Sequence, residues 1–298
     1  VAPVPFASTI YLAAEAVQAA GSEQQKREYL PRIARGELIA TLALAEGPGE
    51  PSFELGRGGM QTGARATDAD KGRLSGSKWP VPDGSIAELA VVAARETAGV
   101  SLFLVDLGHG TVRRETLKTV DPTRDHAKLV FDDVPATRLG QPGQGAPILA
   151  RVLDRAAVLF AFEQVGGASA CLEAATSYAK ERFAFGRPIG SFQAIKHNLA
   201  DMYVALELAR SNAYYGAWAL GADAAELPLA AATARVSASK AFSFAAEENI
   251  QTHGGIGFTW DMDCHLFYRR AKLLALTIGS PRHWKHRVVS GLETRNAA

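Results

Sequence analysis

The chain has 298 residues, of which 47% are hydrophobic and 21% are charged. This is the composition of a globular protein, long enough for one large core or two to three smaller ones. Its 32 basic and 31 acidic residues give a formal net charge of +1, so the charge offers no support for nucleic acid or a membrane surface as a partner. No apolar run approaches the roughly 20 residues of a membrane-spanning helix, and no signal peptide is visible.

The two cysteines, Cys171 and Cys264, lie far apart in the sequence and do not make a disulfide framework. Their low number is typical of a reducing compartment, and we expect a cytoplasmic location. No group of Cys, His and acidic residues has the spacing of a zinc site. We therefore expect no metal.

Residues 8–38 show a helical pattern that Gly21 and Ser22 interrupt. Ser22 and Gln25 have the spacing of a capping box, which predicts that a second helix starts at Ser22. Pro31 lies inside this second helix, so we expect the helix to end or bend there. Residues 1–38 are predicted to be the remainder of an N-terminal helical domain.

Residues 39–142 change to the short period of β-strands. Seven β-rich segments follow one another, and turn residues such as Asp83-Gly84 separate them. Strands of this length and spacing predict a middle β-domain that is an antiparallel barrel or a sandwich.

Residues 143–298 return to a helical pattern. Three long stretches, 148–183, 191–220 and 230–253, place apolar residues three and four apart. Small residues dominate their faces, so the backbones can approach closely, as in a four-helix bundle. The predicted fold class is α+β and multidomain: a helical segment, an antiparallel β-domain and a C-terminal four-helix bundle.

Two polar, glycine-rich breaks interrupt the predicted bundle helices. They are "RFAFGRPIGSFQ" at residues 182–193 and "QTHGGIGFTW" at residues 251–260. Glycine lets a ligand come close to the backbone, and Arg182 can bind a phosphate or a carboxylate through its planar guanidinium. Phe258 adds a flat apolar surface, and Gln193 can pair with the edge of a nucleobase. A dinucleotide requires this mixture of groups.

The residues alone also allow a simpler interpretation. Neither break has the spacing of a known phosphate loop. Glycines at helix ends are usually C-caps, and an arginine near a helix end is usually solvated or part of a cap.

The two breaks and their helical context, "ERFAFGRPIGSFQAIKHNLADM" and "QTHGGIGFTWDMDCHLFYRRAK", resemble in order the two signature regions of the acyl-CoA dehydrogenase flavoproteins. The resemblance covers nearly the whole chain, but the family's first helices have no counterpart. We therefore expect the chain to be N-terminally incomplete relative to the family.

The resemblance implies FAD as cofactor. The position of Arg182 meets the FAD pyrophosphate, those of Phe185 and Gln193 line the adenosine end, and the Gln-x-x-Gly-Gly from Gln251 reaches the FAD of a neighbouring subunit. This implies same-family subunits in a homo- or hetero-oligomer, a dimer or a tetramer. The residues expected to bind FAD are Arg182, Phe185, Phe192, Gln193, Gln251, His253, Gly254 and Gly255.

The expected catalytic base is missing. In the family a glutamate removes the α-proton of the acyl-CoA thioester, and a desolvated carboxylate suits this task. The two positions that carry this glutamate in different members correspond to Ile278 and Ala156, and neither side chain accepts a proton. Glu163 shares the helix face of Ala156 but lies roughly 10 Å further along the axis. Its alternative role is an ion-paired, helix-packing carboxylate.

The β-domain departs from the family pattern as well. The family's Thr-Glu-Pro reads Ala45-Glu46-Gly47, which lacks a flavin-contacting hydroxyl. Its Trp-Ile-Thr reads Pro80-Val81-Pro82, so Pro82 cannot donate the hydroxyl hydrogen bond near the flavin. Trp79, one place early, either covers the flavin or is an ordinary barrel aromatic.

These observations predict an FAD-dependent acyl-CoA dehydrogenase of lipid β-oxidation, or the FAD-sharing subunit of a mixed assembly such as those that act on steroid thioesters. The alternatives are a flavin monooxygenase of the same superfamily and a non-catalytic structural partner. The expected partners are an acyl-CoA thioester, same-family subunits and, at the level of the family, an electron-transfer flavoprotein. Nucleic acid and membrane are not expected partners.

Overall fold

The computed structural model describes residues 2–47 and 60–297. These residues form two compact units, one from Ala2 to Ala156 and one from Ala157 onward. The predicted division at 1–38, 39–142 and 143–298 stays a prediction. Within the described ranges, no helix combines the length and the apolar character that crossing a membrane requires.

The first unit begins with helices: the π-helical η1 (Ala7–Ala14), α1 (Glu15–Ala20) and α2 (Glu23–Ala34). The predicted capping box is confirmed, because the Ser22 hydroxyl accepts a hydrogen bond from the Gln25 amide and the Gln25 side chain accepts one from the Ser22 amide. The expectation that Pro31 ends this helix was wrong, because α2 continues to Ala34, whereas a bend at Pro31 stays a prediction. Pro31 is exposed in the last turns of α2, and its carbonyl still accepts from the Arg35 amide at 3.1 Å. The helix therefore loses only the bond that the proline nitrogen cannot donate.

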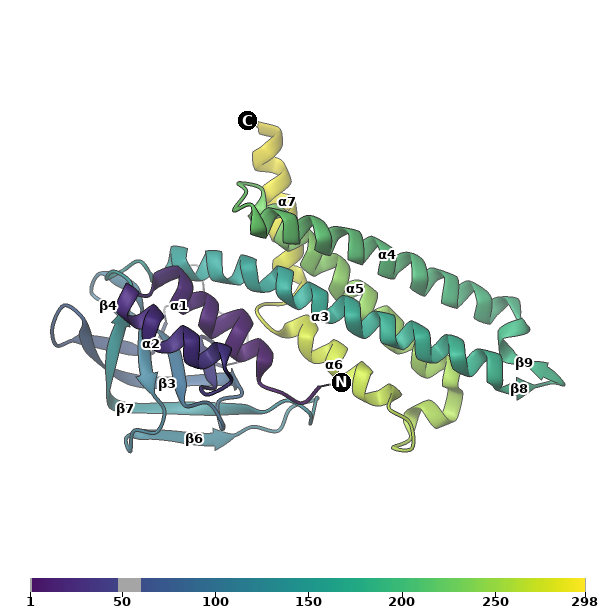
Figure 1. The fold of residues 1–298 in the computed structure, drawn as a ribbon, viewed down its shortest axis with the longest axis horizontal. Helices are drawn as coiled ribbons and strands as arrows, with labels where there is room; N and C mark the ends of the chain where they lie inside the picture. Colours follow the sequence, from purple (N-terminus) through teal and green to yellow (C-terminus); the bar gives the residue numbers. More distant parts are fainter. Residues whose placement is uncertain (1, 48–59, 298) are drawn as a thin grey trace. The chain divides into compact units, whose positions relative to one another are not determined.

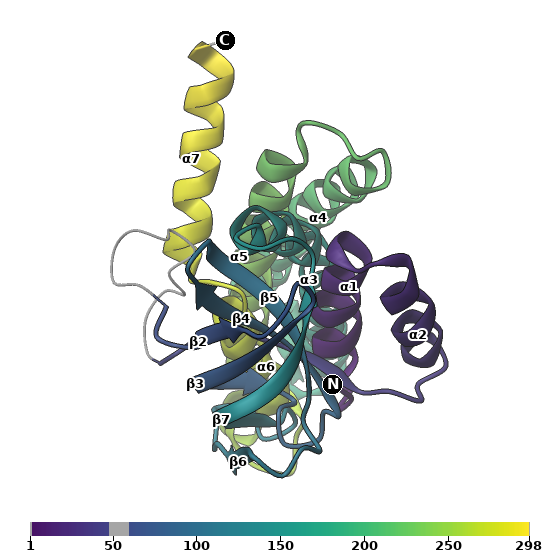
Figure 2. The same cartoon turned by 90° about the vertical axis from the view of Figure 1, so that its left-hand side faces the viewer.

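All seven predicted strands are present. The barrel closes because β4 pairs with β5, β5 with β7, β7 with β3, β3 with β2, and β2 returns to β4. Most pairs are antiparallel as predicted, but β1 and β2 each pair with β4 in parallel. Figure 2 shows β3 between β2 and β7. The strands are β1 (Ala40–Ala43), β2 (Gly63–Ala66), β3 (Lys71–Pro82), β4 (Leu89–Glu96), β5 (Gly99–Asp106), β6 (Val112–Thr116) and β7 (His126–Leu139).

Side chains from η1 tie the helical segment to the barrel. The Thr9 hydroxyl donates to the Ala40 carbonyl at 2.9 Å at the start of β1. The Ser8 hydroxyl donates to the Asp83 carboxylate at 2.6 Å in the turn after β3. Both bonds are buried, where an unmatched polar group is costly, so they fix how η1 lies against the sheet.

The second unit contains the predicted bundle helices, and the helical part of α3 that belongs to it runs beside α4, α5 and α6 (Figure 1). The three long predicted helices are confirmed as α3, α4 and α5, and Gly254 ends α5 with φ +66°. The helices are α3 (Gly145–Glu181), α4 (Gln193–Gly221), α5 (Leu227–His253), α6 (Cys264–Leu276) and α7 (Pro281–Ala297). Short elements join them: β8 (Phe183–Ala184), β9 (Arg187–Pro188), η2 (Ile189–Ser191) and η3 (Gly254–Phe258).

The bundle packs through small residues, as its composition predicts. Gly167 of α3 faces the ring of Phe242 on α5, which is only 1% exposed. A Cβ atom on Gly167 would lie 2.4 Å from the Phe242 Cζ atom. The neighbouring Gly166 is exposed, and a Cβ there would meet nothing within 4 Å.

This pair of glycines gives a matched test of the packing. Gly167→Ala should lower the free energy of unfolding by about 1–3 kcal/mol, because the buried Phe242 ring has no room to move away. Gly166→Ala should raise it by about 0.5–1 kcal/mol through helix propensity alone. Urea denaturation followed by circular dichroism measures both. Equal stability of the two variants would contradict the packing described here.

Candidate cofactor site

The first break folds as a tight hairpin between α3 and α4. β8 and β9 pair antiparallel, and Phe185 and Gly186 form the turn with φ +54° and +78°. The Phe185 side chain is 95% exposed. A bulky residue in the left-handed region is uncommon and strained, and a fully exposed phenylalanine gains nothing from the core. Both features indicate a binding surface.

Aromatic and cationic groups gather around this hairpin. The Phe185 and Phe192 rings meet edge to face with centroids 6.2 Å apart, and the Arg187 guanidinium lies 4.1 Å from the Phe192 centroid. Arg182 is exposed and, within the described residues, has no acidic partner. Gln193 is exposed as the first residue of α4, whose N-terminus carries no side-chain cap. Uncapped helix amides and a free guanidinium suit an anionic group such as a pyrophosphate.

The second break follows the last turn of α5. Gln251 is exposed, and Gly254 takes a left-handed φ of +66° that a glycine adopts without strain. A Cβ on Gly254 or Gly255 would meet no atom within 4 Å, so there is open space over this backbone. The Phe258 ring is 77% exposed beside it. A flat ligand can therefore approach the backbone closely here.

The structure brings the two breaks together at one end of the bundle (Figure 1). The Tyr178 ring in the last turn of α3 stacks on the His253 ring in the last turn of α5, with centroids 4.2 Å apart. The Asn198 amide in α4 donates to the Glu248 carboxylate in α5 at 2.9 Å. The sequence signal was the pair of glycine-rich breaks, but nothing in it indicated that they lie side by side in one chain.

All eight residues predicted to bind FAD lie at this end of the bundle. Seven of them are exposed or partly exposed, and only His253 is buried. His253 is only 6% exposed, and its ring packs against Tyr178 instead of facing solvent. The donors, the aromatic faces and the open glycine backbone fit the pyrophosphate and adenosine of a dinucleotide.

Neither of the two positions where the base was expected carries a proton acceptor. Ile278 packs against an apolar cluster that includes Trp284, and the Trp284 indole donates to the Ile278 carbonyl at 3.2 Å. Ala156 is fully buried on α3. Glu163 forms an ion pair with Arg270 of α6 at 3.1 Å, as its alternative role predicted. These three positions offer no free carboxylate for proton abstraction.

The comparisons with known proteins agree with this arrangement. The model of the acyl-CoA dehydrogenase C-terminal domain matches residues 143–281. Acyl-CoA dehydrogenase IpdE2 of Mycobacterium tuberculosis is 39% identical over 270 residues, which cover 89% of this chain and 74% of that protein. The chain belongs to the acyl-CoA dehydrogenase family. It is thus an oxidoreductase of acyl-CoA dehydrogenase type, from a family of flavoproteins.

Other relatives and solved structures are similar over most of this chain, but the match covers different shares of their own length. The mitochondrial short-chain specific acyl-CoA dehydrogenase of Rattus norvegicus is 32% identical over 270 residues, and the match covers 87% of this chain but only 64% of the relative. Butyryl-CoA dehydrogenase from Megasphaera elsdenii has a TM-score of 0.90 at 27% identity, covering 96% of this chain and 76% of that one. The Tcur3481–Tcur3483 steroid ACAD, as a G363A variant, has a TM-score of 0.86 at 32% identity, covering 99% and 78%.

A buried guanidinium that the sequence analysis missed holds the segment before Ile278. Arg235 of α5 is 1% exposed and donates to the carbonyls of Leu274 and Thr277, the latter at 2.7 Å. It also donates to the Gln164 side chain of α3 at 2.8 Å. Burial lowers the pKa of Arg235 to about 9, so the group remains charged at neutral pH. Its only sequence signal was an arginine in an otherwise small and apolar helix face.

A second buried cation, Lys78, binds Glu46 in the β-domain segment that departs from the family pattern. The Lys78 ammonium lies 2.7 Å from the Glu46 carboxylate, which also accepts from the Gln61 and Thr62 amides. Lys78 is fully buried, and this burial lowers its pKa to about 8. Trp79 is half-buried, with its ring against Gly47, and its role toward a flavin stays a prediction.

Neither cysteine is suited to act as a nucleophile. Cys171 and Cys264 are free and buried, as the absence of a disulfide framework predicted. Burial raises the pKa of Cys171 to about 12, so its reactive thiolate is scarce at neutral pH. The described residues bring together no group of His, Cys, Asp and Glu that suits a metal ion.

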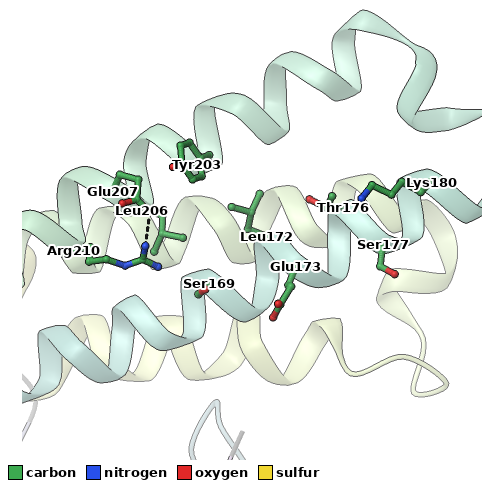
Figure 3. A pocket seen from close by; sticks show the side chains of 10 residues that line it. All are labelled: Ser169, Leu172, Glu173, Thr176, Ser177, Lys180, Tyr203, Leu206, Glu207 and Arg210. Atoms are coloured by element: carbon green, nitrogen blue, oxygen red, sulfur yellow. Dashed lines mark hydrogen bonds and ion pairs between the residues drawn. The ribbon is translucent and has the colours of Figure 1, made fainter.

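A groove of about 410 Å³ runs between α3 and α4 on the same unit (Figure 3). Among the residues drawn in Figure 3, one ion pair is present, between Glu207 and Arg210 one turn apart on α4. Glu173 and Lys180 are both exposed, so these two charges stay in contact with solvent. The lining residues are Ser169, Leu172, Glu173, Thr176, Ser177, Lys180, Tyr203, Leu206, Glu207 and Arg210.

The depressed pKa of Lys78 predicts how stability changes with pH. Between pH 8 and about 10.5 the unfolded chain binds a proton at this position that the folded chain has released, so stability rises with pH across that window. The free energy of unfolding of the wild type should therefore increase relative to Lys78→Met as the pH rises from 8 to about 10.5. Urea denaturation at a series of pH values measures the difference. The exposed Lys71 of the same strand provides the control variant, Lys71→Met, and a difference between wild type and Lys78→Met that stays constant would contradict the assignment.

Proposed function

We propose that this chain is the FAD-sharing, base-lacking subunit of a mixed acyl-CoA dehydrogenase, in which a same-family partner supplies the base. One observation carries the proposal. The two segments that resemble the family's FAD signatures lie together with accessible donors, whereas Ile278 and Ala156 stand at both positions where the base is expected. A dehydrogenase that works alone needs both a site for FAD and a catalytic base, and this chain offers only the residues for the first.

The binding half follows from the side chains. Arg182 is expected to bind the pyrophosphate, with the amides at the start of α4 as further donors. Gln193 and Gln251 can pair with the edge of the adenine, while Gly254 and Gly255 leave room for it. The exposed Phe185 and Phe258 exclude water from its faces. Because both breaks lie at one end of the bundle, we propose that they bind the adenosine diphosphate half of a single FAD, rather than two FAD molecules of different subunits.

FAD, when bound, supplies an acceptor for the hydride that leaves the β-carbon of an acyl-CoA thioester. Removal of the α-proton requires a desolvated carboxylate close to the substrate. This chain pairs Glu163 with Arg270 and places apolar side chains where the family carries glutamate, so the proton is expected to pass to a carboxylate of the partner.

The likeness to the Tcur3481–Tcur3483 steroid ACAD supports a bulky, ring-bearing thioester as substrate and a two-component assembly. An electron-transfer flavoprotein is the proposed electron acceptor, as expected for the family. A chain in the solved structure of the electron transferring flavoprotein of Acidaminococcus fermentans matches this fold with a TM-score of 0.90, which is consistent with such a partner. A cytoplasmic location remains a prediction.

The FAD assignment predicts the effect of removing one charge. Arg182→Ala should weaken FAD binding by about 10- to 100-fold, since charge-assisted hydrogen bonds to the pyrophosphate are lost. Lys180→Ala removes an exposed charge two residues earlier, in the last turn of α3, and should leave the affinity unchanged. Titration of the apoprotein with FAD, followed by flavin fluorescence, measures both. Equal losses in the two variants would refute a specific role for Arg182.

The mixed-assembly assignment predicts activity only with a partner. The chain alone should reduce an electron-accepting dye with acyl-CoA at no more than background rate, because it lacks the base. Co-expression with a glutamate-bearing acyl-CoA dehydrogenase encoded beside it should restore the rate and the FAD content. Full activity of the chain alone would rule out the partner. Rapid reoxidation of the flavin by oxygen with a hydroxylated product would identify a monooxygenase instead.

A further inference from the structure

The ends of α3 and α5 are joined by one aromatic stack. The Tyr178 and His253 rings lie nearly parallel, with centroids 4.2 Å apart and an angle of 25° between their planes. Tyr178 is half-buried and His253 is 6% exposed. The contact links two helix ends that are 75 residues apart in the sequence, directly beside both breaks.

The His253 ring is held in one orientation. Its Nδ1 atom lies 2.8 Å from the Asn249 carbonyl, one turn earlier on α5. A carbonyl only accepts, so Nδ1 is the donor and carries the proton. This bond and the stack together fix the ring between the two helices. Such a buried, doubly held ring does not reach out to a ligand.

Both breaks depend on the residues of this stack for their position. The Arg182 amide donates to the Tyr178 carbonyl at 2.8 Å, so Arg182 lies one helical turn after Tyr178. Gly254 follows His253 directly, and its amide bonds to the carbonyls of Ile250 and Gln251. A shift between the two rings therefore displaces Arg182 relative to the open backbone of Gly254.

We infer that Tyr178 and His253 are positioning residues that set the spacing between the pyrophosphate-binding Arg182 and the adenine-binding glycine segment. This inference rests on the proposed function and assigns His253 a different role from direct contact with FAD. A ligand that contacts both segments at once binds most tightly when their spacing suits it, because a mismatch weakens the contacts at one end.

The experiment compares Tyr178→Leu and His253→Leu with a matched control, Tyr214→Leu. Tyr214 meets Phe162 edge to face at 5.4 Å and so joins α3 to α4, away from the breaks. His253→Phe retains an aromatic ring for the stack but lacks Nδ1. The chain is prepared with its same-family partner, and the affinities for FAD and for adenosine diphosphate are measured by calorimetry, with thermal unfolding of the unliganded protein as the measure of stability.

Tyr178→Leu and His253→Leu should weaken FAD and adenosine diphosphate alike, by about five- to tenfold, the size expected for losing an aromatic pair. Tyr214→Leu should leave both affinities unchanged, and His253→Phe should recover most of the loss.

Wild-type affinity in Tyr178→Leu and His253→Leu would overturn the inference, as would losses that follow thermal stability equally in all four variants. A wild-type protein that binds adenosine diphosphate but no FAD would instead overturn the proposed function. A wild type that binds neither would overturn both.

Discussion

Arg235 is a positive charge buried in the middle of the bundle, where its contacts hold the end of α6. Carbonyl groups at the end of a helix have no partner within it. At the end of α6, one terminal nitrogen of Arg235 donates to the carbonyls of Leu274 and Thr277, and the other donates to Gln164. Burying a cation without partners would be costly, so the three contacts and the attraction of Glu163 are what make its position tolerable. The geometry of the segment from Leu274 to Ile278 follows from this arrangement.

The charged residues of the bundle fall into two groups: buried ones that stabilise the packing and exposed ones that are available to a ligand. Arg235 and the Glu163–Arg270 pair place paired charges in the middle of the bundle, although the Nε atom of Arg235 is buried without a hydrogen-bond partner. The exposed donors collect at the end of the bundle, around Arg182 and Gln193. Charge in the middle serves architecture, and charge at the end is available to a ligand.

Local patterns in the sequence predicted most of the fold, and long-range contacts account for what they missed. The Ser22–Gln25 capping box and the strand and helix periods depend on near neighbours, so they could be predicted. The parallel pairing of β1 with β4 and the continuation of α2 through Pro31 depend on packing and solvent exposure that no short window contains. The same division holds in the candidate site: the breaks themselves were visible in the sequence, but the Tyr178–His253 stack that joins them was not, and the burial of His253 depends on that stack.

Ile278 has a further consequence for how this chain can change. Its φ of +60° is strained for a β-branched residue, yet its side chain is packed into the apolar cluster around Trp284. Restoring a glutamate at this position would bring a carboxylate against the apolar groups that now surround Ile278, at a cost in desolvation. A glutamate at position 278 would therefore be tolerated only if its apolar neighbours changed as well. The packing around Ile278 therefore makes this position unfavourable for a carboxylate unless its apolar neighbours change with it.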